Sequence, residues 1–254
     1  METVIAMGII TIMVTAFLAA FGPAVQGIRK SMSAKEANRL ATTLEHELSV
    51  LRYDEHKDNG GEYTTSFEKA YEWIKNSGGS DEKKIVLLYQ YRGNPNIEPY
   101  DDGSLKPLED KNLDIAGKDY VLQSVVRLLG DDKVQKELAA GVVEGRVFYV
   151  RMTQLVFAKK LVDGKEQTAL TVAGEDEVPG GKGKIIDPTE PRAATTTHED
   201  YPEAVIAFQA EFYVLKSSIY AYVNDTFTLD DDNGDGHPDA AGKPVFTRNM
   251  AIRR

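Results

Sequence analysis

Late in the chain, oxygen-bearing side chains recur at alternate positions of a short acidic segment, residues 231–239. If Asp231 is counted as position 1, carboxylate or amide oxygens stand at positions 1, 3, 5 and 9, a glycine stands at position 6 and a histidine stands at position 7. A tight turn brings alternate side chains together, and calcium takes oxygen ligands at this spacing because it is a hard cation. The segment predicts one calcium ion bound by Asp231, Asn233, Asp235, Asp239 and the carbonyl of His237.

The twelfth position of this segment is Gly242, where an EF-hand needs a bidentate glutamate, so the segment is not an EF-hand. It resembles the calcium loops of dockerin and thrombospondin type 3 repeats, which lack the second helix of an EF-hand. A solvated acidic turn is the alternative interpretation, because Asn-Gly and Asp-Gly dipeptides form turns in any protein.

The composition excludes several other kinds of chemistry. The 254 residues include 40 acidic and 30 basic side chains, and a formal net charge of −10 argues against a general nucleic-acid-binding surface. The chain has no cysteine, which excludes disulfides, thiolate metal sites and thiol nucleophiles. It has no G-x-S-x-G, H-E-x-x-H or dinucleotide-binding motif. We therefore expect neither an enzyme nor a nucleic-acid partner.

The beginning of the chain has an uncommon charge pattern. No charged residue stands between Glu2 and Arg29, and residues 3–28 are mostly apolar. A helix that spans a bilayer needs roughly 20 such residues, so residues 1–28 are predicted to enter a membrane. A cleaved secretory signal is one alternative, although its n-region would be basic and its apolar run shorter. A plain signal anchor is another alternative, although Arg29 and Lys30 would then favour a cytoplasmic location for the residues that follow the apolar run.

The next segment, Arg29 to Arg52, contains neither glycine nor proline and has a helical period. One face of it carries Ala37, Leu40, Leu44, Leu48 and Leu51. Most of its charges lie off that face, on Lys35, Glu36, Arg39, Glu45 and Glu47. An apolar stripe needs a partner, and a β-sheet laid against it would bury it. We predict one helix from Thr3 to Arg52, kinked near Gly22-Pro23 because proline removes a helical hydrogen bond.

The remaining residues predict a mixed set of elements. A capping box at Thr65-x-x-Glu68 opens a short helix that ends at Gly78-Gly79. Another short helix is expected at residues 131–140, and residues 94–110 and 174–201 are expected to be loops. Strands are expected at residues 83–91, 146–161 and 167–172, with a hairpin turn at Asp163-Gly164 and an edge strand at residues 244–250. Residues 120–129 are expected to form a strand, with a helix as the alternative, and residues 204–223 one long strand or a pair of strands. The fold class is therefore α+β, with a long N-terminal helix packed on an antiparallel sheet.

The first residues, Met1-Glu2-Thr3-Val4-Ile5-Ala6-Met7-Gly8-Ile9-Ile10, resemble the processed start of a type IV pilin or of a type II secretion pseudopilin. In that family a glutamate opens an apolar helix, and Glu2 matches it. Two features depart from the pattern: no basic leader ending in glycine stands before Met1, and Pro23 lies about one turn later than the helix-breaking proline of the family. Pseudopilins often bind calcium in a C-terminal loop, which agrees with the acidic segment.

The resemblance implies that residues 1–28 are the membrane and polymerisation half of the helix, and that residues 29–254 form a pilin-like α+β head. It implies that Glu2 pairs with the terminal amine of a neighbouring subunit. The partners would be like or related pilin subunits, and the bacterial inner membrane before assembly. The head would lie in the periplasm, and outside the cell after assembly into a fibre. The alternative function is a single-pass membrane-anchored periplasmic protein that binds calcium or another ligand and does not polymerise.

Overall fold

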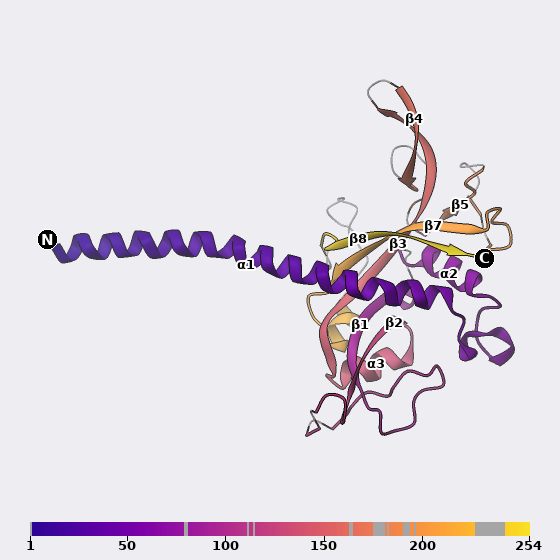
Figure 1. Ribbon diagram of the computed structural model, residues 1–254, viewed down its shortest axis with the longest axis horizontal. Coiled ribbons are helices and arrows are strands. Elements are labelled where there is room, and N and C mark those ends of the chain that lie inside the picture. The colour runs from indigo at the N-terminus through magenta and orange to yellow at the C-terminus, as the bar shows by residue number, and fades with distance from the viewer. Residues whose placement is uncertain are drawn as a thin grey trace.

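The computed structural model describes residues 2–78, 81–110, 112–113, 115–162, 165–174, 181, 183–189, 194–195, 197–226 and 242–254. Its longest element is α1 (Glu2–Ser49), one helix of 48 residues. Figure 1 shows the first half of α1 projecting into open space, while the second half lies along a sheet. The predicted continuity of this helix is confirmed. The helix passes through Pro23 without a break, and Figure 1 shows only a gentle bend in place of the expected kink.

A single antiparallel sheet forms the centre of the domain, as the sequence predicted. Its strands are β1 (Val86–Gly93), β2 (Val121–Leu128), β3 (Val143–Val162), β4 (Lys165–Val172), β7 (Val205–Val214) and β8 (Phe246–Arg253). The spatial order is β2-β1-β3-β7-β8, and β4 pairs with the distal part of β3. A separate pair of short strands, β5 (Ile185–Ile186) and β6 (Ala194–Thr195), lies beside it. The predicted strand between residues 244 and 250 is β8, which is an edge strand of the sheet.

Helices cover both faces of this sheet. The second half of α1 and α2 (Ser66–Asn76) pack on one face, where they bury Val86 and Leu88 of β1. The short helix α3 (Asp132–Ala139) packs on the other face with Leu87 and Tyr89. Successive side chains of a strand point to opposite faces, so a strand covered on both sides is buried along its length. This accounts for the nearly continuous apolar sequence of β1.

The apolar stripe of α1 is the main contact between helix and sheet. Four of the five predicted stripe residues, Ala37, Leu40, Leu44 and Leu48, are at most 1% exposed. The fifth, Leu51, lies beyond the end of the helix and is half-buried. Glu47 corrects the expectation that the charges lie off the stripe, because it is only 5% exposed. It stands three residues after Leu44, which places it on the buried side of the helix.

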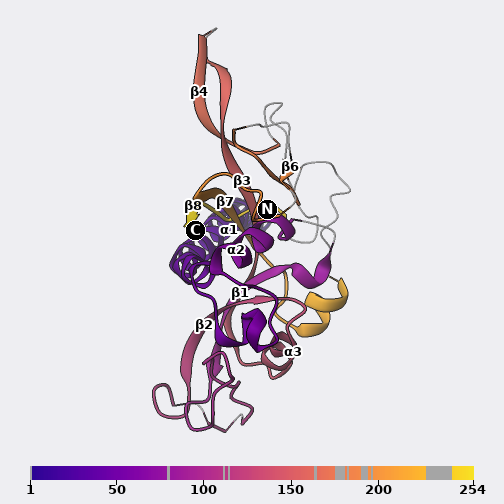
Figure 2. The ribbon, with the colours of Figure 1, turned by 90° about the vertical axis from the view of Figure 1, so that its right-hand side faces the viewer.

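The two-stranded end of the β3–β4 hairpin stands out from the sheet. Val162 pairs with Lys165, so β3 and β4 form the predicted hairpin; the expected turn residues, 163–164, lie outside the described residues. Figures 1 and 2 show this arm extending away from the sheet. Phe157 of β3 pairs with Leu170 of β4 on the arm, and the Phe157 side chain is 70% exposed.

Two predicted segments have a different structure. Residues 174–201 were expected to be an exposed loop, but they contain β5 and the buried residues Ile185, Ile186 and Tyr201. The side-chain amide of Gln154 bonds both the N–H and the carbonyl of Ile186 at 2.8 and 2.9 Å, which extends the edge of β3 towards this segment. Residues 204–223 were expected to form one long strand or a pair of strands. The strand β7 ends at Val214 instead, and residues 222–226 form a π-helical turn.

The stripe of α1 generates the first testable prediction. Replacement of Leu44 by Ala should lower the free energy of unfolding by about 2–5 kcal/mol, because the helix and sheet cannot close the resulting cavity completely. His46→Ala, two residues away on the exposed face, should change it by less than about 0.5 kcal/mol. Urea unfolding of both variants in detergent tests this prediction. Equal losses in the two variants would contradict the observed orientation of the helix.

Candidate functional site

The projecting half of α1 is the most unusual surface of the protein. Its large apolar side chains are exposed, including Met7 at 74%, Ile12 at 70% and Phe17 at 62%. By length and composition α1 could cross a membrane, and within the described residues it is the one helix that could do so. None of its most apolar stretch is buried in the protein. A soluble monomer rarely exposes so large an apolar surface, so this half of the helix needs an apolar environment from outside the chain.

Two hydroxyl groups in the projecting half are satisfied within the helix. The hydroxyl of Thr11 donates a hydrogen bond to the carbonyl of Met7 at 2.8 Å, and that of Thr15 donates to the carbonyl of Thr11 at 2.8 Å. The rings of Phe17 and Phe21 stack with centroids 5.1 Å apart. In an apolar surrounding every polar group needs an internal partner, and these threonine hydroxyl groups have one.

Of the predicted site residues, only Glu2 lies within the described part of the chain. Glu2 is the first residue of α1, as expected for a glutamate that opens the helix. The five predicted calcium ligands, Asp231, Asn233, Asp235, His237 and Asp239, lie outside the described residues. Within the described residues, no three or more histidine, aspartate or glutamate side chains form a group that could hold a metal ion. The calcium site therefore stays a prediction.

At its other end α1 is fixed by a cluster of buried charges that we call the inner cluster, made of Glu47, Arg52, Glu55 and Lys69. The ammonium group of Lys69, which has no exposed surface, lies 2.7 Å from Glu47 Oε1 and 2.6 Å from Glu55 Oε1. Arg52 donates two hydrogen bonds to the Glu47 carboxylate, at 3.1 Å from Nε and 2.5 Å from Nη2. The cluster joins the end of α1, the following 3-10 turn and α2.

The inner cluster favours the ionised form of Glu47. Burial alone would raise the pKa of this carboxyl, but the hydrogen bonds from Arg52 and the charge of Lys69 outweigh burial and hold the pKa below its usual value. Lys69 also lies 4.9 Å from the centre of the Trp73 ring, which adds a cation–π contact. The charges in this cluster are paired with one another, so it holds elements in place and presents no free acid or base for catalysis.

A second cluster, the outer cluster, consists of Asp102, Arg127, Lys133 and Glu137. Arg127 contacts Asp102 at 2.6 Å and Glu137 at 3.0 Å, and Lys133 contacts Asp102 at 2.9 Å. The hydroxyl of Tyr89 donates to Glu137 at 2.6 Å. Burial raises the pKa of Glu137, whereas hydrogen bonds from Ser104 and Lys133 and the charge of Arg127 lower the pKa of Asp102 despite its burial.

The two clusters meet at a pocket. Arg52 Nη1 donates to the Asp102 carbonyl at 2.6 Å, so the inner and outer clusters are joined directly. Beside them lies a pocket of about 430 Å³ whose lining includes Tyr63, Trp73 and Val126. Its volume is in the range of small-molecule sites. Four of its lining residues, Glu47, Arg52, Asp102 and Arg127, are engaged in the ion pairs of the two clusters.

Comparison of the chain with protein-family models, curated proteins and solved structures gives no match.

Neither cluster was predicted from the sequence. Glu47 could have been recognised, because it follows Leu44 by three residues and therefore shares the buried face of the helix. Lys69 stands between Phe67 and Tyr71 in a short helix, and nothing in that pattern requires its ammonium group to be buried. Arg127 and Glu137 come from different elements, and only the tertiary fold brings them together.

The inner cluster generates the second prediction. Glu47→Gln should lower the free energy of unfolding at neutral pH by about 3 kcal/mol, because it leaves part of a buried cationic group unpaired. The folded-state pKa of Glu47 is lowered, so its contribution is complete above the unfolded value near 4.5 and is lost as the pH falls through the folded value. The difference between the wild type and this variant should therefore shrink in acid below about pH 4.5.

Glu45→Gln is the matched control. Glu45 pairs with Arg248 at 3.2 Å, but its side chain is 42% exposed, so its loss should cost less than about 1 kcal/mol at any pH. Unfolding free energies at neutral and acidic pH measure both variants. If the two variants lose equal stability, the inner cluster does not fix the end of α1 as described.

Proposed function

We propose that this protein is a pilin-like structural subunit, of a type IV pilus or a secretion pseudopilus, that assembles through its N-terminal helix. The observation that carries this proposal is the division of α1, whose first half is apolar and exposed while its second half belongs to the core of the domain. The continuous helix α1 therefore connects a folded domain with an exposed apolar surface, and that surface needs a partner. The resemblance of the first residues to processed pilins supports the same function.

The two halves of α1 have different roles in this mechanism. Before assembly the first half is held in the bacterial inner membrane, and the domain lies in the periplasm. During assembly the apolar halves of neighbouring subunits pack against one another and leave the lipid together, which carries the domains to the outside of the fibre. Van der Waals packing and polar pairs drive helix association where water is absent.

Glu2 gives this packing its register. A carboxylate buried among apolar helices is costly unless it is paired, and the terminal amine of a neighbouring subunit offers the opposite charge. Only one axial offset between two helices brings the two groups together. An unpaired Glu2 penalises every other offset, so the fibre has a defined rise between its subunits.

The third prediction tests this role. Because the chain has no cysteine, a single cysteine at Ala16 reports contacts between the apolar halves of two subunits by disulfide cross-linking. In this background Glu2→Ala should leave membrane insertion intact, because removal of a charge makes insertion easier, and should reduce cross-linking in cells that assemble fibres about ten-fold or more. Membrane extraction and gel electrophoresis measure the two quantities.

A chain without residues 1–28 is the negative control, and it should appear neither in membranes nor in cross-linked products.

Two outcomes would contradict parts of the proposal. Undiminished cross-linking in Glu2→Ala would remove the assembly role of Glu2. A complete lack of cross-linking in Ala16→Cys with Glu2 intact would favour the alternative, an anchored periplasmic protein that does not polymerise and that binds a ligand. The pocket beside Trp73 would then be a candidate site for that ligand.

Calcium binding by residues 231–239 is a second, separate part of the proposal. Five aspartates stand between positions 230 and 239 and repel one another unless a cation lies among them. The strand β8 begins a few residues later at Phe246 and lies at the edge of the sheet. We propose that calcium orders the segment that leads into β8 and so favours the pairing of β8 with β7.

The fourth prediction follows from this linkage. A ligand that binds only the folded state raises the melting temperature, so calcium should stabilise the protein relative to chelator, and magnesium should do so poorly because it requires near-octahedral geometry. Asp235→Ala should abolish the shift, whereas Asp101→Ala, at an exposed position of a loop, should retain it. Identical melting curves in calcium and chelator would make residues 231–239 a solvated acidic turn.

A further inference from the structure

One end of the domain faces the projecting apolar half of α1. It consists of the turn of α1 around Glu36, the start of β3, the end of β7 and the start of β8, and we call it the proximal end. Glu36 of α1 accepts a hydrogen bond from the backbone N–H of Arg146 at 3.2 Å. The next residue, Val147, accepts from the N–H of Leu215, and Phe212 accepts from the N–H of Val245. These contacts place the end of β7 and the start of β8 level with the turn of α1 that contains Glu36.

The proximal end carries exposed cations. Arg29, Lys30 and Lys35 are exposed on α1, Lys216 follows Leu215 directly, and Lys243 precedes Val245 by two residues. None of these five side chains has an ion pair within the part of the chain that the structure describes. The two glutamates nearby are engaged, Glu36 with the backbone of Arg146 and Glu144 with Arg92 at 3.2 Å. Within the described residues, unpaired positive charge thus gathers beside the apolar helix, in a chain whose net charge is −10.

Exposed apolar side chains lie among these cations. Ile28 is 60% exposed and Met32 is 63% exposed on α1. Ile219 is 66% exposed and precedes the π-helical turn at residues 222–226. Figure 1 shows this turn, in yellow-orange, on the side of the sheet towards the projecting helix. Long cationic side chains mixed with single apolar residues suit a surface that meets lipid headgroups.

The length of the apolar run agrees with this contact. Residues 3–28 extend about 39 Å as a helix, which exceeds the roughly 30 Å of hydrocarbon in a bilayer and brings Arg29 and Lys30 to the outer part of the headgroup layer. Glu36 lies about 9–11 Å beyond Lys30 and Arg29 along the helix axis. The proximal end is therefore held close to the membrane before assembly, and its cations face the lipid.

We propose that the proximal end rests on the headgroups of an anionic leaflet, with Lys35, Lys216 and Lys243 contacting lipid phosphates and Ile219 entering the headgroup layer. This contact rests on the membrane anchoring in the proposed function. It fixes the orientation of the domain above the bilayer, because two contacts on the sheet end and one on α1 define a plane. Each cation near an anionic surface strengthens the contact equilibrium about five-fold.

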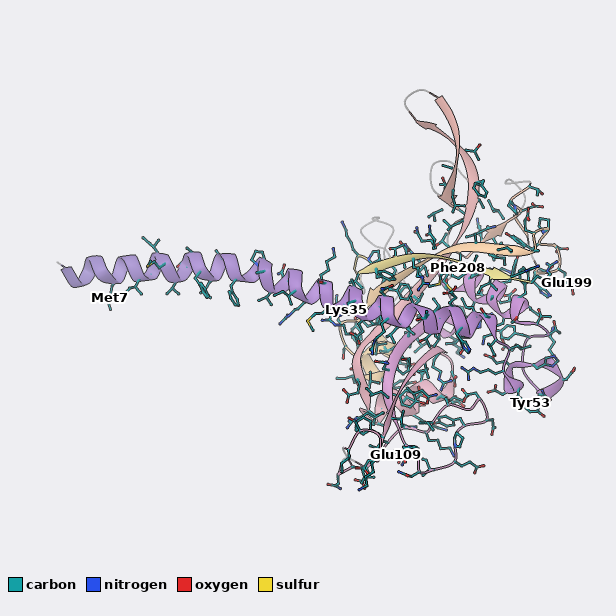
Figure 3. The ribbon with its side chains drawn as sticks, in the orientation of Figure 1. Met7, Lys35, Tyr53, Glu109, Glu199 and Phe208 are labelled. Carbon is teal, nitrogen blue, oxygen red and sulfur yellow. The ribbon has the colours of Figure 1, made fainter. Side chains whose placement is uncertain are left out.

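The experiment uses the full chain in vesicles and the lack of native cysteine. A fluorophore is attached to Ile219→Cys or, as the control, to Tyr53→Cys, and the vesicles contain a lipid that carries a quencher in its headgroup. Figure 3 shows Lys35 and Tyr53 at opposite ends of the domain. Chelator is present throughout, so calcium cannot bridge the acidic segment to lipid. Vesicles of phosphatidylcholine are compared with vesicles that also contain phosphatidylglycerol.

Addition of phosphatidylglycerol should quench the label at position 219 and leave the label at position 53 unchanged. Lys216→Gln should lower the equilibrium constant of the headgroup contact, measured by quenching at position 219, about five-fold. Lys57→Gln, beyond the opposite end of α1, should leave it unchanged. Equal quenching at both positions, or quenching indifferent to phosphatidylglycerol, would overturn the inference. Contact between labels that rises with protein density would assign the surface to a second copy of the chain and would overturn it as well.

Vesicle flotation separates this inference from the proposed function. A chain that floats with the vesicles but shows no quenching at position 219 overturns the headgroup contact alone. A chain that does not float overturns the membrane anchoring and the contact together.

Discussion

The rest of the structure depends on the packing of the second half of α1 against the sheet. Leu40, Leu44 and Leu48 lose nearly all of their exposed surface in this contact, which supplies most of what the helix contributes to the core. A helix that leaves its own domain cannot be stabilised along its free half by tertiary contacts. Its direction is therefore set by the half that is packed, and the projecting half follows that direction because α1 is continuous.

Charged side chains have different roles at the two ends of this packed half, which are the distal end at the inner cluster and the proximal end near Glu36. At the distal end, Lys69 is buried between two carboxylates, and such an arrangement costs desolvation that only close pairing offsets. Apolar residues of similar volume could be as stable, but the pairs specify one position for the end of the helix relative to α2. At the proximal end the cations are exposed and unpaired within the described residues, so they add little to folding and are available to a partner.

Much of this architecture could be predicted from the sequence, because its main features are periodic. The leucine stripe defined the packed half of α1, the Asp163-Gly164 turn defined the hairpin, and the capping residue Thr65 defined the start of α2, where its hydroxyl accepts from the Glu68 N–H at 3.1 Å. These signals are local, so no tertiary knowledge was needed to read them.

The features that escaped prediction depend on contacts between distant segments. The dipeptide Ile185-Ile186 is too short to show a period, and its burial depends on the amide of Gln154 in another strand. The strand β1 was expected to begin at Lys83 but begins at Val86, because the Asp81 side chain accepts from the Lys83 N–H and caps a 3-10 turn at residues 82–84. The burial of Lys69 depends on Glu47 and Glu55, which no local pattern connects to it. The role of Glu2 was inferred from a family resemblance and the calcium loop from the spacing of its oxygen-bearing residues, and both functions stay predictions.

The position of β8 in the sheet has a consequence for the order of events during biogenesis. Arg248 of β8 bonds Glu45 of α1 at 3.2 Å, although 203 residues separate them in the chain. Contacts of such long sequence separation form slowly, because a long segment must be ordered before they are made. If α1 is inserted in the membrane first, its leucine stripe faces an incomplete sheet until the ribosome has delivered β8 and the chain has crossed the bilayer. Translocation, rather than synthesis of the helix, then sets the earliest moment at which the domain becomes competent for any later step.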